Sequence, residues 1–191
     1  MIVLSGNDIS VSFGGETLFH DVNFRLEENG RAGLVGVNGC GKTTLMHVIN
    51  GRQEAETGGI SKAAGIKLGC MEQYVIRDDN ITLYDEVLEI FRPLIDAENE
   101  LADIAVAIDT GEHSEQTLSR QMQLQERFER DGGLTYKSMT SSALIGLGFS
   151  EEDFGKPISV MSGGQKSKAQ LAKLLLSGSN ILLLDEPTNH L

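Results

Sequence analysis

The feature that most constrains the fold of this chain is the stretch GVNGCGKT at positions 36–43. It fits the pattern G-x-x-x-x-G-K-[ST], whose glycines let successive backbone N–H groups point inward at phosphate oxygens. The preceding RAGLVGV predicts a short strand, and the following TTLMHVIN predicts a helix whose positive N-terminal end attracts anions. We therefore expect a phosphate-binding loop rather than a flexible glycine turn. Its candidate nucleotide-binding residues are Gly36, Asn38, Gly39, Cys40, Gly41, Lys42, Thr43 and Thr44.

Three side chains of this loop have separate expected roles. Lys42 supplies positive charge to the β- and γ-phosphates and is a candidate catalytic residue, and Thr43 offers a hydroxyl to Mg²⁺. Cys40 is a small spacer, and it is also a candidate site of oxidation because it lies inside the loop.

Two adjacent carboxylates follow the apolar run ILLL near the end of the chain. A buried strand that ends in Asp185 delivers this carboxylate to the phosphate loop across the sheet, where it holds Mg²⁺ directly or through water. Glu186 points differently, and we expect it to orient or deprotonate the attacking water. The alternative is a solvent-facing pair without a role.

The chain divides into three stretches. Residues 1–76 form a nucleotide-binding core, in which DISVSF and TLFHDVNFRL alternate as strands, GIKLGCMEQ is another strand, and Gly51 caps the loop helix. Residues 77–160 form a helical part, in which Pro93 opens a helix and a hairpin spans about 93–131. Residues 161–191 carry a serine-capped helix, with Leu171, Leu174 and Leu175 on one side, and the terminal strand that returns to the core.

Charge and composition narrow the classes of function. The net charge is −12, and residues 77–131 hold 15 acidic against 5 basic residues, which argues against non-specific binding of nucleic acid. No apolar run approaches the roughly 20 residues that a membrane helix needs, and the N-terminus lacks the pattern of a signal peptide. Two cysteines give no disulfide framework, so we expect a cytoplasmic protein without membrane insertion.

The phosphate loop, the motif SGGQ and the run LLLDEP occur in the order found in ATP-binding cassette (ABC) ATPases, which this chain resembles. DEPTNHL, ERDGG and ALIGLGF resemble the ABC-F subfamily. The resemblance implies an α/β fold of the P-loop NTPase class, with an antiparallel β subdomain and a helical subdomain that carries an arm, here the acidic hairpin. It also implies ATP and Mg²⁺ as ligands, ATP hydrolysis, and an action on ribosomes in translation.

The resemblance assigns further roles. Phe13 matches the aromatic residue that stacks on adenine, and Gln73 matches the glutamine that senses Mg²⁺ and the γ-phosphate, which makes it a candidate metal ligand and catalytic residue. The signature motif caps ATP that is held by a second cassette, on the same chain or in a homodimer. Its residues are Ser162, Gly163, Gly164 and Gln165.

The sequence departs from the family after the terminal strand, because the switch histidine and the strand that leads to it are missing. We therefore expect an N-terminal cassette that is truncated within its core. Two alternatives stay open: the ATP-binding subunit of an ABC membrane transporter, and a piece that binds nucleotide without hydrolysing it.

Overall fold

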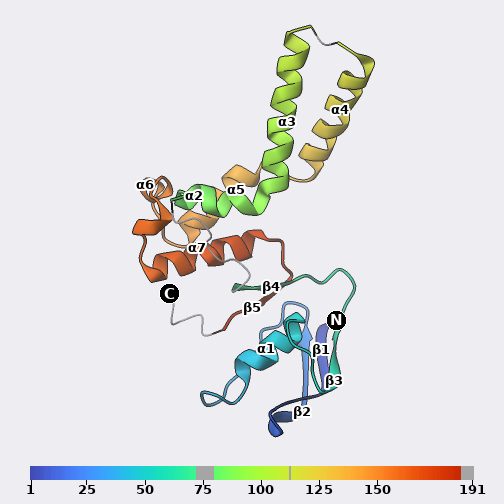
Figure 1. The fold of residues 1–191 in the computed structure, drawn as a ribbon, viewed down its shortest axis with the longest axis vertical. Coiled ribbons are helices and arrows are strands. Elements are labelled where there is room, and N and C mark those ends of the chain that lie inside the picture. The colour runs from blue at the N-terminus through green and yellow to red at the C-terminus, as the bar shows by residue number, and fades with distance from the viewer. Residues whose placement is uncertain (72–79, 112, 186–191) are drawn as a thin grey trace. The chain divides into compact units, whose positions relative to one another are not determined.

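The computed structural model describes residues 1–71, 80–111 and 113–185, and the chain folds as two compact units (Figure 1). The sheet unit comprises residues 1–73 and 178–187, and the helical unit comprises residues 74–177 and 188–191. From the sequence, helix α7 (Gly163–Leu176) was expected to belong to one stretch with the terminal strand. In the structure this helix belongs to the helical unit.

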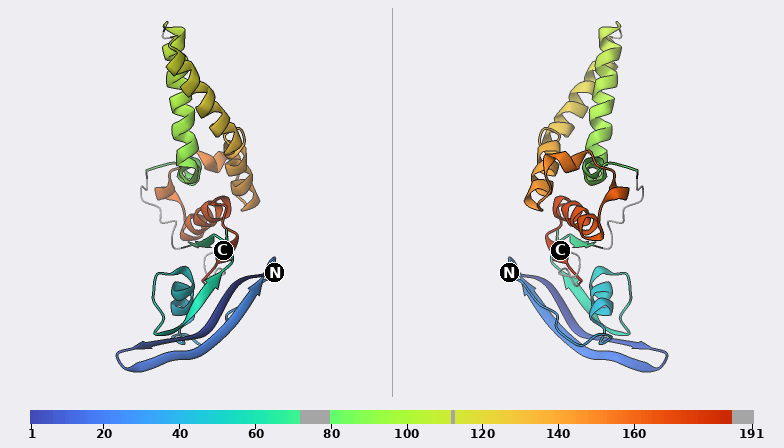
Figure 2. Two further views of the ribbon diagram at one scale, coloured as in Figure 1. Left: turned by 90° about the vertical axis from the view of Figure 1, so that its right-hand side faces the viewer. Right: turned by 90° about the vertical axis from the view of Figure 1, so that its left-hand side faces the viewer.

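A three-stranded antiparallel sheet forms most of the sheet unit. Its strands, in the order β2-β1-β3, are β1 (Ile2–Phe13), β2 (Glu16–Glu27) and β3 (Thr57–Lys62). Gly14 and Gly15, with φ of 60° and 88°, turn the chain between β1 and β2, as expected for a two-residue hairpin loop. Figure 2 shows the long curved ribbon that these two strands form. Ile9 and Val11 of β1 are buried as the alternation predicts, whereas Phe13 at the strand end is 54% exposed.

Helix α1 (Lys42–Asn50) buries Leu45 and Val48 in the same core. Its first turn carries no acidic side chain, and its last turn ends at Gly51 with φ of 74°, as the sequence predicts. The helix follows the phosphate loop directly, so the core fixes where the loop lies.

A second, parallel sheet pairs β4 (Leu68–Cys70) with β5 (Ile181–Leu183). Asn180 sets the register, because its side-chain oxygen accepts from the Lys67 backbone N–H at 2.8 Å and its own N–H donates to the Lys67 carbonyl at 2.9 Å. Ile181 and Leu183 are buried, so β5 brings the chain to Asp185 from within the core.

The strand expected at residues 31–37 does not form. This stretch has no regular secondary structure, and Leu34, Val35 and Val37 are 44%, 94% and 77% exposed. A strand needs a hydrogen-bonding neighbour, and the described strands pair only as β2-β1-β3 and β4-β5. Strand β3, which carries two adjacent glycines, is an element that the alternation did not predict.

In its described residues, the helical unit is built from helices and two short 3₁₀ turns. Its elements are α2 (Leu83–Leu88), η2 (Glu89–Phe91), α3 (Arg92–Asp109), α4 (Glu115–Arg130), α5 (Tyr136–Gly146), α6 (Glu151–Phe154), η3 (Ile158–Val160) and α7. Leu83, Leu144, Ile158 and Ala169 are fully buried in its core. Leu174 is buried on α7, but Leu175 is 50% exposed, so the expectation that the two leucines share the buried side is wrong. Consecutive helical residues point about 100° apart.

The antiparallel hairpin of α3 and α4 forms as predicted. The ERDGG motif at the end of α4 shapes the turn that connects the hairpin to α5. Gly132 has φ of 98°, and a Cβ on Gly133 would lie 2.4 Å from the ring of Phe128, so both positions need glycine. The Tyr136 hydroxyl donates to Glu98 on α3, and Lys137 binds the same carboxylate at 2.7 Å.

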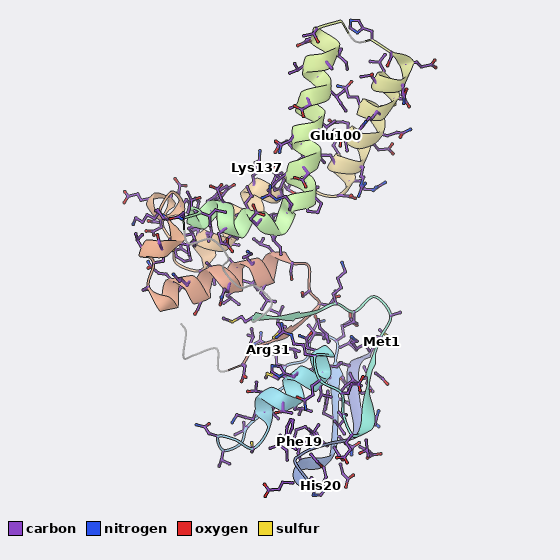
Figure 3. All side chains as sticks on the ribbon, viewed as in Figure 1. Met1, Phe19, His20, Arg31, Glu100 and Lys137 are labelled. Carbon is purple, nitrogen blue, oxygen red and sulfur yellow. The ribbon has the colours of Figure 1, made fainter. Side chains whose placement is uncertain are left out.

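These contacts link α5 to the hairpin base, where Figure 3 labels Lys137. Hydrogen bonds from Lys137 and Tyr136 lower the pKa of Glu98. Burial and the bond to Glu98 raise the pKa of Tyr136. The charged form of Glu98 is therefore part of the joint between α3 and α5.

Every helix in the described part of the chain is too short or too polar to cross a lipid bilayer.

Candidate functional site

The phosphate loop lies in the sheet unit and has the curled backbone that its glycines allow. Gly39 and Gly41 adopt φ of 84° and 96°, a region that other residues rarely enter. A Cβ on Gly36 would lie 2.6 Å from the Cys40 sulfur, so the Cys40 side chain packs closely against this glycine within the loop. Cys40 is exposed and Cys70 is buried, and neither forms a disulfide.

Lys42 stabilises the curl from inside. Its ammonium group donates to the carbonyl oxygens of Gly36 at 2.9 Å and Val37 at 3.0 Å. Because α1 begins at Lys42 without a side-chain cap at Gly41, the first N–H groups of the helix have no capping side chain. The loop therefore combines a cation, a helix N-terminus and turned backbone amides, which is a donor set suited to phosphate.

An open hollow of about 420 Å³ lies beside the loop. Asn38, Gly39 and the first residues of α1, Lys42 to Thr44, form one side, and Phe13 and Leu18 of the β1–β2 hairpin form the other. A planar aromatic base can stack on an exposed ring such as Phe13. Leu18 was not expected here. The register that pairs Ser12 with Thr17 places it near Phe13, but a sequence alone does not give that register.

The Thr43 hydroxyl donates to the Asp185 carboxylate at an oxygen–oxygen distance of 2.5 Å. The two residues are 142 positions apart, and the meeting depends on α1 and β5 sharing one core. A hydroxyl and a carboxylate are the hard oxygen donors that Mg²⁺ prefers, and the remaining positions would come from phosphate and water. The site residues therefore fit a nucleotide with Mg²⁺, which would supply charge stabilisation at the phosphates when bound.

The signature residues lie in the helical unit at the N-terminus of α7. Ser162 and Gln165 form a capping box: the Ser162 hydroxyl accepts from the Gln165 N–H at 3.3 Å, and the Gln165 side chain accepts from the Ser162 N–H at 2.9 Å. Gly163 and Gly164 are exposed, so the helix end is open to an anion.

Two expected site residues, Gln73 and Glu186, lie outside the described residues. The structure thus brings together Phe13, the loop and Asp185 in one unit, and it presents the signature motif on the other unit.

Residues 19–189 match a family model described as ABC transporter. The chain belongs to this family. ABC cassettes are in general ATPases that bind ATP with Mg²⁺ and work in pairs.

Curated relatives place this cassette with the ABC-F proteins. ABC transporter F family member 5 of Arabidopsis thaliana is 31% identical over 96% of the chain and 27% of its own length. ATP-binding protein Uup of Haemophilus influenzae is 32% identical over 100% of the chain and 29% of its own length. YdiF of Bacillus subtilis is 37% identical over 100% of the chain and 30% of its own length. The cassette thus spans about a third of the curated relatives it matches.

Solved structures confirm the fold. An ATP-binding subunit of an ABC transporter aligns with a TM-score of 0.64 at 20% identity, covering 98% of this cassette and 68% of that chain. The structure of cbiO1 from Clostridium perfringens, part of the ABC transporter complex cbiONQ, aligns with a TM-score of 0.61 at 18% identity, covering 98% and 66%. The expected α/β cassette fold, with its antiparallel sheet and helical part, is therefore correct.

Proposed function

We propose that this cassette binds MgATP and hydrolyses it as part of a soluble, cytoplasmic ABC-F protein that contains a second cassette. The observation that carries the proposal is the 2.5 Å contact between Thr43 and Asp185 at the edge of the phosphate loop. It joins the two oxygen donors expected for Mg²⁺ to the Lys42 loop and to the hollow beside Phe13.

We assign Glu186 and Gln73 to the hydrolytic step, in which Glu186 orients or deprotonates the attacking water. Lys42 positions the phosphates, and Phe13 stacks on the base. Ser162 to Gln165 act on a nucleotide held by the partner cassette, because a capped helix with an exposed N-terminus can face an anion from outside. This chain alone therefore binds nucleotide without turnover.

Isothermal titration calorimetry with MgATP tests the binding step on this chain. Thr43→Val removes the hydroxyl next to Asp185 and should abolish the Mg²⁺-dependent part of the affinity. Thr57→Val is the matched control, because Thr57 lies on β3 and its hydroxyl donates to the Asp8 carbonyl, away from the loop. Absence of MgATP binding by the wild-type chain, or equal loss in both variants, contradicts the proposal.

We further propose that the complete protein uses the ATP cycle to gate binding to ribosomes. In a protein that carries this chain and a second cassette, Glu186→Gln should keep ATP binding and abolish turnover. Co-sedimentation with ribosomes should then increase in ATP. Rapid multiple turnover by this variant would refute the role of Glu186, and sedimentation that does not respond to ATP would refute the ribosomal role.

A transporter subunit is the second candidate, because the aligned solved structures include ATP-binding subunits of transporters. The acidic hairpin that follows α2 favours the ABC-F function. Co-purification of the complete protein with membranes at native expression would favour the transporter instead.

A further inference from the structure

The hairpin of α3 and α4 has an uneven charge that the nucleotide site does not explain. Between Arg92 and Arg120, the 27 residues 93–119 contain seven acidic residues and no lysine or arginine. The nearest basic groups are already paired, since Arg92 binds Glu89 and Arg120 binds Glu100 at 2.6 Å. Three of the seven acidic residues, Asp96, Glu98 and Glu100, lie within ion-pair distance of Arg92, Lys137 and Arg120. The excess negative charge therefore comes from the acidic residues beyond Glu100.

A hollow of about 480 Å³ lies between the two helices in this region. Four residues of α3 line it with the spacing of one helix face: Glu100, Asp103, Ile104 and Ala107. From α4, Thr117 and Arg120 contribute to the opposite wall. Figure 3 labels Glu100 on the length of α3 beside α4.

The residues that line the hollow combine apolar side chains with carboxylate oxygens that can accept further hydrogen bonds. Ile104 and Ala107 supply apolar surface. The Asp103 side chain is exposed and makes no hydrogen bond or ion pair with the described part of the chain. Glu100 uses only Oε1 for Arg120, at 2.6 and 2.7 Å. A carboxylate can accept more hydrogen bonds than this.

Exposed apolar side chains also occur on other faces of the same two helices. Val106 on α3 is 63% exposed, and Leu118 and Met122 on α4 are 46% and 70% exposed. Apolar surface mixed with carboxylates fits a side chain that has a long aliphatic stem and a cationic head. It does not fit nucleic acid, whose phosphates need lysine or arginine.

We propose that this hollow docks a basic amphipathic segment of another protein. An arginine or lysine of that segment lays its stem on Ile104 and Ala107, and its head pairs with Asp103 and the free oxygen of Glu100. The site is independent of the proposed ATPase cycle, because none of these residues belongs to the nucleotide site.

Fluorescence anisotropy with a labelled synthetic helical peptide of arginine and leucine tests the docking on the whole chain. The wild-type chain should bind the peptide, and Asp103→Lys should weaken binding roughly tenfold or more because it reverses a charge within the hollow. Glu151→Lys is the matched control: it makes the same charge change at an exposed position on α6. Its affinity should stay within about twofold of wild type, since screening limits distant charges.

Two further variants separate the hollow from general acidity. Ala107→Trp should weaken peptide binding by filling the hollow, and Asp103→Asn should weaken it without adding a bulky group. Circular dichroism checks that each variant keeps its helices. If Ala107→Trp does not fold, Asp103→Asn, which changes an exposed side chain, still tests whether the peptide binds at the hollow. Equal losses for Asp103→Lys and Glu151→Lys, or no loss for Asp103→Asn, overturn the proposal. Tighter binding of a single-stranded RNA oligonucleotide than of the peptide overturns it as well.

Discussion

Replacing Lys173 with methionine removes the cation from a buried ion pair between α7 and α2. The Lys173 ammonium lies 2.6 Å from the Glu86 carboxylate, and the two side chains are only 11% and 6% exposed. Val87 and Ala172, their neighbours in sequence, are fully buried in the apolar core of the helical unit. The Glu86 charge would therefore lose its partner in a place where water cannot replace it.

The expected loss is about 3–5 kcal/mol of unfolding free energy, the usual cost of leaving one buried charge unpaired. Replacing both partners by apolar residues, Glu86→Leu with Lys173→Met, removes the unpaired charge. The double variant should regain most of that loss and can exceed the wild type in stability, because two desolvated charges are then no longer buried.

Urea denaturation followed by far-ultraviolet circular dichroism provides the measurement, since most helices belong to the helical unit and the chain contains no tryptophan. At a typical urea dependence of about 1–3 kcal/mol per molar, Lys173→Met should lower the midpoint by at least about 1 M. Arg120→Met is the matched control, because it breaks an ion pair in which Arg120 is 68% exposed and should change little. The reasoning fails if Lys173→Met and Arg120→Met have the same midpoint. It also fails if the double variant is no more stable than Lys173→Met.

Three further predictions concern other parts of the molecule. Gly58→Ala should destabilise the sheet unit by about 1–3 kcal/mol in thermal unfolding, because Gly58 has φ of 79° and an added Cβ would lie 2.3 Å from backbone oxygens of β1. Gly59→Ala should lower the stability clearly less, because an added Cβ there meets open space. Hydrogen bonds from Lys156 and then from Ser150 lower the pKa of Asp153 to about 2, so NMR titration should show this low value, and Lys156→Met should raise it. The stabilisation by ionised Asp153 is present above its ordinary pKa of 3.8 and is lost as the pH falls through about 2; an unchanged titration in Lys156→Met would contradict the assignment. Phe13→Ala should weaken the binding of ATP more than the binding of inorganic triphosphate, as measured by calorimetry. Equal losses of affinity for the two ligands would argue against base stacking.

The sequence predicted the elements whose signals are local. The phosphate loop, helix α1 with its Gly51 cap, the β1–β2 hairpin turned by two glycines and the serine cap of α7 each depend on neighbouring residues. Local chemistry fixes the backbone there, so tertiary context adds little. The same holds for the α3–α4 hairpin, whose apolar periodicity and Pro93 are visible in the sequence.

The expectations that failed depended on distant partners. RAGLVGV has the composition of a strand, but strand formation needs a neighbouring strand, and residues 31–37 remain exposed. Strand β3 was missed because its glycines conceal any alternation, whereas pairing with β1 makes it a strand. The i, i+3, i+4 spacing of Leu171, Leu174 and Leu175 puts them on one side of the helix, but the buried stripe of α7 runs through Ala169, Ala172 and Lys173, and Leu175 lies outside it. The approach of Asp185 to Thr43 followed from the expected order of motifs, but its distance needed the fold.

The grip of Lys42 on the carbonyls of Gly36 and Val37 has a consequence for how a nucleotide would be captured. Two hydrogen bonds made within the loop itself limit the conformational freedom that the backbone can lose on binding, so the affinity would be set by contacts with the phosphates rather than by ordering of the backbone. Capture would then resemble entry into a rigid receptor, with a rate governed by diffusion into the open mouth beside Phe13.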